Sequence, residues 1–85
     1  FKIAIEGHTD DNPVANGRFA SNWELSAARA TNVVRLFGGA ETPVHRMRAV
    51  AFAETQPKFA NRDGAGNPLP ENQAKNRRII IRVHR

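Results

Sequence analysis

The strongest secondary-structure signal in this chain is the stretch SNWELSAARATNVVRLFGG, residues 21–39. It opens with a capping box, because Ser21 is followed three residues later by Glu24, and this pattern predicts a helix start. Apolar residues at steps of three and four predict a core-facing stripe made of Ala27, Ala30, Val34 and Phe37. We therefore expect a helix over residues 22–37, ended by a left-handed turn at the glycines 38–39.

Three strands are predicted around this helix. Residues 1–6 alternate apolar and polar side chains, residues 44–53 give a weaker strand interrupted by basic residues, and residues 78–83 give a strong strand. The segment 54–75 has no clear period, which is typical of a functional loop, with room for a short helix from residue 70. Two strands have clear apolar sides: Phe1, Ile3 and Ile5 in the first, and Ile79, Ile81 and Val83, expected to be buried, in the last.

The composition limits the classes of function. The 85 residues suffice for one small domain with a thin core, and 40% hydrophobic with 25% charged residues is ordinary for a folded domain. The absence of cysteine excludes disulfide scaffolds, thiolate metal sites and cysteine nucleophiles. No apolar run approaches the roughly 20 residues that cross a bilayer. Because the chain opens inside a predicted strand, without methionine or a signal sequence, we expect it to belong to a longer protein.

The residues after the first strand and at the start of the helix form the candidate site. In a strand–loop–helix unit, ligand contacts are commonly made just beyond the strand, where Asp10 and Asp11 lie. A second stripe of the helix carries polar residues at helical spacing: Asn22, Ser26 and Arg29. A carboxylate, an amide and a guanidinium around one concavity suit a zwitterion, such as a peptide end. The alternative, favoured on spacing alone, is a structural salt bridge between Asp10 and Arg29.

Two other chemistries find less support in the sequence. The three histidines are far apart and lack paired-ligand spacing, so we expect neither a metal site nor a cofactor. His8 and Asp10, with Ser21 or Ser26, have the composition of a hydrolase triad. However, neither serine lies in a nucleophile elbow, and Ser21 already has the capping role. We therefore expect no enzymatic activity.

Basic residues gather at the end of the chain, whose formal net charge is +5. A basic stripe is the usual footprint of a nucleic-acid-binding protein. No RNA-binding signature with exposed stacking rings accompanies it, and arginines on a solvated strand edge explain it at least as well. The residues concerned are Arg77, Arg78, Arg82, His84 and Arg85.

Three motifs occur together in one known family. GHTD at residues 7–10, SNWELSAARA at 21–30 and NRRI at 76–79 closely resemble those of the OmpA-like peptidoglycan-binding domain, in the same order. The resemblance implies an α+β fold, a β/α/β/α/β-β two-layer sandwich on a mixed sheet, here lacking the first β-α unit. It implies that residues 1–85 form one such domain, incomplete at its N-terminus. One departure concerns Ala51 and Ala53, since members of the family often carry glycine near these positions.

The resemblance also implies a set of ligand-binding residues. The family holds the diaminopimelate of the peptidoglycan stem peptide, whose free end carries an ammonium and a carboxylate. By position in the motifs, Asp10 would accept the ammonium and Arg29 would bind the carboxylate. The remaining implied contacts are hydrogen bonds from Thr9 and Asn22, a wall from Leu25, and one of Arg77 and Arg78, whose side chains alternate along the predicted strand.

Within the family, the extended first loop and the Gln56-Pro57 stretch resemble the stator proteins of the flagellar motor. This implies a periplasmic domain of a protein anchored in the bacterial inner membrane. Its partners would be peptidoglycan and, through an upstream region, a MotA-type membrane protein, and the resemblance also allows a homodimer. The alternatives are a wall-tethering lipoprotein or a secretion-system anchor and, from another class, a nucleic-acid-binding module that uses the basic C-terminal strand.

Overall fold

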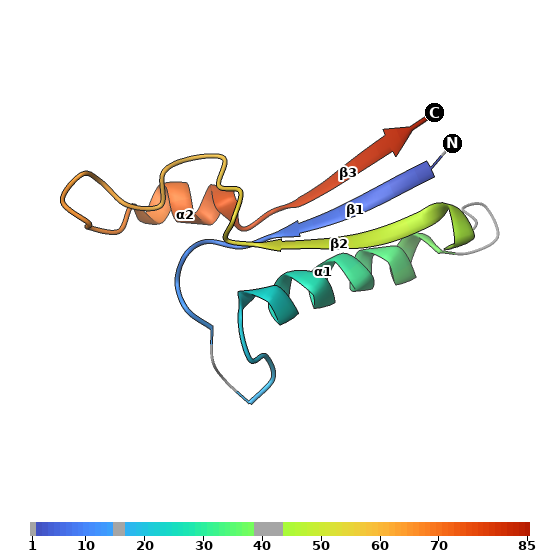
Figure 1. The fold of residues 1–85 in the computed structure, drawn as a ribbon, viewed down its shortest axis with the longest axis horizontal. Coiled ribbons are helices and arrows are strands. Elements are labelled where there is room, and N and C mark those ends of the chain that lie inside the picture. The colour runs from blue at the N-terminus through green and yellow to red at the C-terminus, as the bar shows by residue number, and fades with distance from the viewer. Residues whose placement is uncertain (1, 15–16, 39–43) are drawn as a thin grey trace.

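The computed structural model describes residues 2–14, 17–38 and 44–85 (Figure 1). The predicted order of elements is confirmed, including the short helix from Pro70, whereas β1 continues past Glu6 and the first residues expected in the second strand form a 3-10 turn. Within the described ranges, no helix is long and apolar enough to cross a membrane. The elements are β1 (Lys2–His8), α1 (Asn22–Phe37), the 3-10 turn η1 (Val44–Arg46), β2 (Met47–Ala53), α2 (Pro70–Asn76) and β3 (Ile79–His84).

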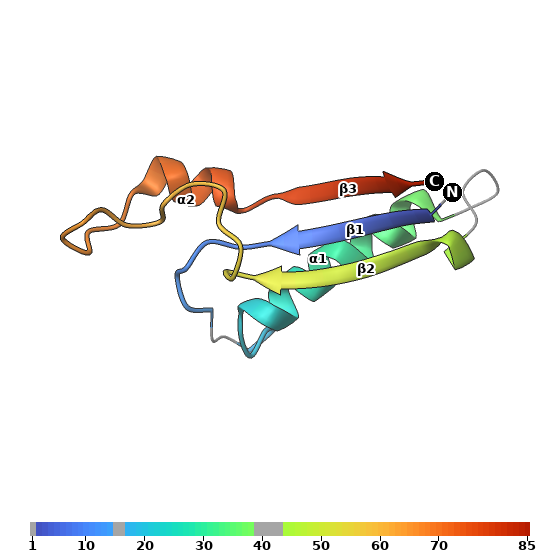
Figure 2. The same cartoon turned by 45° about the horizontal axis from the view of Figure 1, so that its top comes forward.

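The three strands form one mixed sheet in the order β2-β1-β3. β1 pairs with β2 in parallel, with Ile5 opposite Ala49, and with β3 in antiparallel, with Ile5 opposite Ile81. α1 makes the crossover between the parallel strands and packs mainly over β1 and β2 on one face of the sheet (Figures 1 and 2). α2 and the loop before it extend beyond the end of the sheet where β1 and β2 finish. The fold is therefore α+β, as predicted.

The start of α1 lies very close to β1. The helix begins after Ser21, whose hydroxyl oxygen accepts a hydrogen bond from the backbone N–H of Trp23 at 3.1 Å, so the predicted cap is confirmed. A Cβ placed on Gly7 in β1 would lie 2.2 Å from the backbone oxygen of Ser26. The Ser26 hydroxyl also accepts a hydrogen bond from the backbone N–H of Ala53 at the end of β2, at 3.1 Å. Gly7 thus permits the close approach that joins the helix start to the strand ends.

The core is small, and two predictions about it are wrong. Ile81 and Val83 in β3 are 48% and 60% exposed, although both were expected to be buried, and Phe37 of the predicted stripe is also exposed. Pairing opposite β1 places these β3 side chains on the α1 side of the sheet, but α1 packs mainly over β1 and β2 and leaves the edge strand largely uncovered. Among the described residues, the buried hydrophobic side chains are those of Ala4, Ile5, Ala30 and Ala53.

The C-terminal end of α1 differs from its prediction. Gly38 has φ −70° and ψ 114°, so its backbone is extended and not left-handed. Its N–H donates to the Val34 carbonyl at 2.7 Å and completes the last turn of the helix. Gly39, the second glycine of the predicted turn, and Phe1, predicted on the apolar side of the first strand, lie outside the described residues.

Candidate functional site

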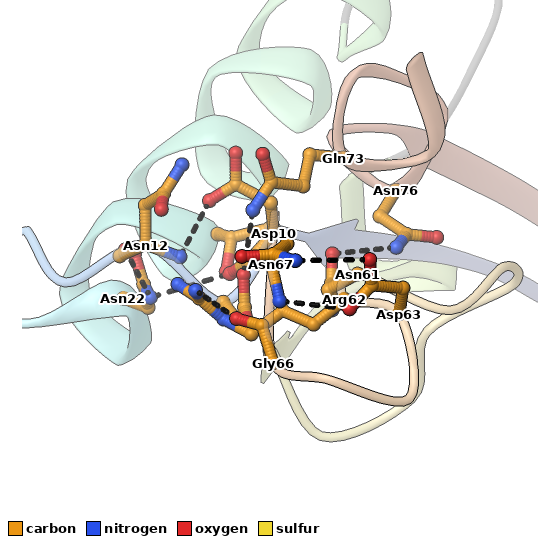
Figure 3. A network of polar contacts seen from close by, with 12 residues as sticks. Asp10, Asn12, Asn22, Asn61, Arg62, Asp63, Gly66, Asn67, Gln73 and Asn76 are labelled. Atoms are coloured by element: carbon orange, nitrogen blue, oxygen red, sulfur yellow. Dashed lines mark hydrogen bonds and ion pairs between the residues drawn. The ribbon is translucent and has the colours of Figure 1, made fainter. Parts of the chain in front are cut away.

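The candidate site lies where β1 ends and α1 begins (Figure 3). At the end of β1, the backbone of His8 exchanges hydrogen bonds with Arg78 at 3.0 and 3.3 Å. The next residue, Thr9, donates its backbone N–H to the Ala53 carbonyl at 2.9 Å. These bonds fix the chain beyond β1 between the end of β2 and the approach to β3, and they bury both Thr9 and Asp10.

Asp10 supplies a buried carboxylate, with only 6% of the residue exposed. One carboxylate oxygen accepts a hydrogen bond from the backbone N–H of Asn12 at 3.0 Å. The other forms an ion pair with Arg77, whose side chain remains 44% exposed. Thr9 donates its hydroxyl to the Asp10 carbonyl at 2.8 Å, which holds the backbone in place. The ion pair therefore joins a buried carboxylate to a guanidinium that remains partly in solvent.

Asn22, the first residue of α1, joins the loop to the helix. Its side-chain nitrogen donates to the carbonyl of Asn12 at 3.0 Å and to that of Asp10 at 3.4 Å. Its side-chain oxygen is buried and has no hydrogen-bond partner in the described part of the chain. Because two carbonyls hold the amide nitrogen, Asn22 fixes the loop after β1 against the first turn of α1.

Asp11 connects this loop to segments far away in the sequence. One of its carboxylate oxygens accepts from Arg62 at 2.7 Å and the other from Gln73 of α2 at 2.9 Å. Partial burial acts to raise the pKa of Asp11, but the hydrogen bonds from Arg62 and Gln73 and the positive charge of Arg62 hold that pKa below its usual value. Asp11 is therefore a charged clamp between the first loop, the 54–69 segment and α2.

Asn76, the last residue of α2, holds the 54–69 segment from within (Figure 3). It is fully buried. Its side-chain oxygen accepts from the backbone N–H groups of Lys58 and Phe59 at 2.9 and 3.0 Å. Its nitrogen donates to the Phe59 carbonyl at 2.8 Å and to the Asn61 side chain at 2.7 Å. Asn76 thus fixes residues 58–61 of the loop that has no hydrophobic period.

The predicted ligand residues fall into two groups. Thr9, Asp10, Asn22 and Arg77 are joined by the hydrogen bonds and the ion pair described above. Arg78 instead donates to the backbone oxygens of Gln56 at 3.0 Å and Asn76 at 3.3 Å, so it holds the loop. Arg29 is exposed on α1 and Leu25 is half-buried there. No ion pair joins Arg29 to Asp10 within the described residues, so the predicted structural salt bridge is wrong: the partner is Arg77.

His8 belongs to a different cluster, on the side of the sheet away from α1. Its Nε2 lies 3.2 Å from a carboxylate oxygen of Glu6, whose other oxygen accepts from Arg82 at 2.6 Å. The His8 ring stacks on Phe52, with centroids 4.9 Å apart. Burial lowers the pKa of His8, against the effect of Glu6. Neither serine of the triad considered above hydrogen-bonds to His8 in the described structure, and the searched residues contain no cluster of three metal-binding side chains.

Sequence reasoning missed the clamp residues Arg62, Gln73 and Asn76. All three lie in or after the segment that has no hydrophobic period, and their partners are distant in sequence, as for Arg62 and Asp11, which are 51 positions apart. The late NRRI motif begins at Asn76, so Asn76 was within reach of the motif comparison, whereas no pattern marked Arg62 or Gln73.

Comparison with known proteins gives consistent results. The chain is 41% identical over 80 residues to the uncharacterized protein YtxE of Bacillus subtilis, covering 93% of this chain and 31% of that protein. It is 36% identical over 84 residues to motility protein B of Bacillus subtilis, covering 95% of this chain and 29% of that protein. The chain therefore spans less than a third of the length of these two relatives.

Solved structures share the fold at similar identity. The cell wall anchor of the T6SS from Pseudomonas aeruginosa matches with a TM-score of 0.78 and 35% identity, over 94% of this chain and 52% of that one. The periplasmic domain of Helicobacter pylori MotB matches with a TM-score of 0.71 and 31% identity, over 94% and 46%. The model of the OmpA family matches residues 1–81. This chain belongs to the OmpA family.

Proposed function

We propose that this chain is a peptidoglycan-binding domain that anchors a longer protein to the bacterial cell wall. Membership of the OmpA family supports this function, as does the similarity to a structure described as a cell wall anchor. The proposed domain comprises residues 1–85 and acts by binding, without catalysing a reaction. Its proposed ligand is the diaminopimelate of the stem peptide, which carries an ammonium and a carboxylate at one end.

Asp10 is the observation that carries the ligand proposal. Its carboxylate is buried at the end of β1, and one oxygen is fixed by the Asn12 N–H. The other oxygen is paired with Arg77, a side chain that is nearly half exposed. The ammonium of the ligand would pair with Asp10 beside this guanidinium or in its place, because both cations are attracted to the same buried carboxylate. Thr9 and Asn22 hold the backbone around Asp10, because both side chains donate hydrogen bonds to its carbonyl.

Arg29 is the proposed partner of the ligand carboxylate. It lies on α1 two turns after Asn22 and is exposed, and its side chain has neither a hydrogen bond nor an ion pair in the part of the chain that the structure describes. Its guanidinium is therefore available to bind a carboxylate with two parallel hydrogen bonds. Leu25 lies on the helix between the two and would line the pocket. Of the two late arginines, Arg77 would contribute, because Arg78 is engaged with backbone carbonyls.

The longer protein is proposed to be a flagellar stator component of the MotB type. The relationship to motility protein B and to the periplasmic domain of Helicobacter pylori MotB supports this placement. The domain would then lie in the periplasm, tethered to the inner membrane and associated through its upstream region with a MotA-type partner, as a monomer or a homodimer. The second candidate is a secretion-system anchor, which the T6SS structure favours.

Binding to purified peptidoglycan tests the proposal. Sacculi are sedimented with the wild-type chain and with Asp10→Asn and Arg29→Ala variants, and diaminopimelate is titrated by calorimetry. Losing one member of a hydrogen-bonded charge pair in a binding site costs about 2–5 kcal/mol, so each variant should bind at least about 30-fold more weakly. Matched controls are Glu71→Gln and Arg35→Ala, which remove like charges from exposed positions and should bind as the wild type does.

Circular dichroism establishes that each variant is folded before its binding is compared. If both site variants fold and still bind sacculi with wild-type affinity, the proposed site is wrong. If the wild type does not bind sacculi but binds DNA with an affinity that falls steeply with salt concentration, the domain belongs to the nucleic-acid-binding class instead.

A further inference from the structure

The face of the sheet opposite α1 carries a row of basic side chains. A Cβ on Gly7 would point at the backbone of Ser26 in α1, so the even-numbered residues of β1 lie on the opposite face. Ala4 belongs to that face, and its partners across the sheet are Arg48 in β2 and Arg82 in β3. One step nearer the termini, Lys2 is paired with His84. We call this surface the basic face; its residues are Lys2, Arg48, Arg82 and His84.

The basic face is open to solvent. α1 covers the other face of the sheet and α2 extends beyond its end, so no described helix lies over the basic face (Figures 1 and 2). Ala4, at its centre, is nevertheless only 2% exposed, because the long side chains of Arg48 and Arg82 flank it. Both arginines are themselves exposed. Their aliphatic stems therefore cover the sheet while their charged ends remain in solvent.

The positive charges of this face are largely unopposed. Among the described residues, Glu6 is the acidic side chain on it, and Glu6 is engaged by Arg82 and His8. The side chains of Lys2 and Arg48 have neither a hydrogen bond nor an ion pair in the described ranges. The other described acidic residues lie in the loops that follow β1 and β2 and in the first turns of α1 and α2. An excess of positive charge therefore gathers on the basic face.

The chemistry of the basic face suits a polymer that carries many separate anionic groups. Arg48 and Arg82 lie on either side of β1, with their backbones about 10 Å apart, so each can pair with an anionic group of its own.

Two other kinds of anionic partner fit this face less well. The aromatic ring of the face, Phe52, is half-buried and stacked on His8, so it is not available to a nucleic-acid base. Peripheral contact with a lipid bilayer uses exposed apolar side chains beside the basic ones. The exposed apolar side chains of β3, Ile81 and Val83, lie on the α1 side of the sheet instead.

We propose that the basic face makes a second contact with the cell wall, by pairing with carboxylates of stem peptides other than the one bound at Asp10. The row lies about 13–20 Å before His8 along β1, so one diaminopimelate cannot occupy both places. A sacculus is a network that presents many stem peptides with free carboxylates, so both contacts can form at once and the second raises the overall affinity. This inference rests on the proposed function and adds a charge-dependent part to the anchor.

Binding to sacculi at different salt concentrations tests the inference. The double variant Lys2→Gln/Arg48→Gln removes two exposed and unpaired charges. It should bind sacculi about three- to tenfold more weakly than the wild type at low salt, and equally at about 1 M salt, where charges are screened beyond about 3 Å. Its affinity for free diaminopimelate, measured by calorimetry, should be unchanged. Poly-glutamate, a soluble polycarboxylate, should bind the wild type at low salt and the double variant more weakly.

The matched control is Arg35→Gln/Lys75→Gln, which removes two exposed charges from α1 and α2 and leaves the basic face intact. It should bind sacculi within about twofold of the wild type. A control that weakens as much as the double variant would show that net charge alone matters, and this result would overturn the inference. Circular dichroism verifies that both double variants are folded.

The remaining outcomes separate this inference from the proposed function. Unchanged binding of the double variant to sacculi at every salt concentration would overturn the second contact and leave the diaminopimelate site in place. If the double variant binds sacculi normally but loses binding to DNA or to phosphatidylglycerol vesicles, the face belongs to nucleic acid or to a membrane, and the inference is wrong. A wild type that does not bind sacculi would remove the proposed function and the inference together.

Discussion

Replacing Gly7 by alanine tests the contact between β1 and α1 on which the site is built. A Cβ on Gly7 would lie 2.2 Å from the backbone oxygen of Ser26 and 2.9 Å from its carbonyl carbon. Both atoms belong to the helix backbone, so no side-chain rotation relieves the overlap. To bring the first distance to an ordinary contact of 3.4 Å, α1 would have to move away from the sheet by about 1 Å.

The cost of this movement can be worked out from the contacts it disturbs. Overpacking of a filled site costs about 1–3 kcal/mol. The same shift lengthens the hydrogen bond from the Ala53 N–H to the Ser26 hydroxyl, now 3.1 Å, and losing it costs a further ~1 kcal/mol. We therefore expect Gly7→Ala to lower the free energy of unfolding by about 2–4 kcal/mol. For a chain of this size, the melting temperature should fall by at least about 8 °C.

Urea and thermal unfolding followed by circular dichroism measure the effect. Gly64→Ala is the matched control, because a Cβ there meets no atom within 4 Å and the backbone φ is not positive. The control should stay within about 0.5 kcal/mol of the wild type. The reasoning is refuted if Gly7→Ala is as stable as the wild type, or if Gly64→Ala loses as much as Gly7→Ala does.

Three further predictions concern the loops and the charged clusters. Asn76→Ala should destabilise the chain by about 2–3 kcal/mol in urea unfolding, since it removes the four hydrogen bonds that this buried side chain makes with the loop; an unchanged midpoint would contradict the role of Asn76. Asp11→Asn should cost about 1 kcal/mol at low salt and less at high salt, because the Arg62 partner is exposed; an effect independent of salt would contradict a charged clamp. The melting temperature should fall as the pH is lowered from 7 to 3, in two steps. The first step begins below about 6.5, because burial lowers the pKa of His8. The second begins below about 4.5, because Arg82 and Arg62 lower the pKa values of Glu6 and Asp11 against the effect of burial. All three groups bind protons more weakly when folded, so a melting temperature that rises on acidification would contradict this cause.

Local sequence patterns predicted the boundaries of the helices and strands better than they predicted which side chains other elements cover. The boundaries of α1 follow from a cap and a periodic stripe that both lie within the helix, and the structure confirms them. The apolar side of β3 was also identified, but not its exposure, because exposure depends on which strands α1 covers. β3 lies at the edge of the sheet because it pairs with β1, a strand at the other end of the sequence. The alternation of side chains within β3 does not indicate this position.

The last residue of β2, Ala53, has an unusual backbone conformation. Ala53 has φ 52°, in the left-handed region that glycine adopts without strain, and the family resemblance indicated that glycine is common near residues 51 and 53. The strained alanine lies at the β1–β2 register shift opposite His8, where its carbonyl receives the Thr9 N–H. The motif comparison thus pointed to this part of the chain, and the structure shows that residue 53 has the unusual backbone and supports the candidate site.

The sequence could not decide whether Arg77 or Arg78 is the partner of Asp10. The prediction used the alternation of side chains along a strand, but both arginines precede the strand. β3 begins at Ile79, and Arg77 is instead the C-cap of α2, where its N–H donates to the Gln73 carbonyl at 3.2 Å. Gln73 in turn donates to Asp11, the neighbour of Asp10. The counter-ion of the buried carboxylate is therefore positioned by α2, and α2 is held to the first loop by the Asp11 clamp. A weakened clamp would move Arg77 relative to Asp10. The Asp11→Asn variant should therefore change the affinity of the chain for diaminopimelate, even though Asp11 is not one of the proposed ligand contacts.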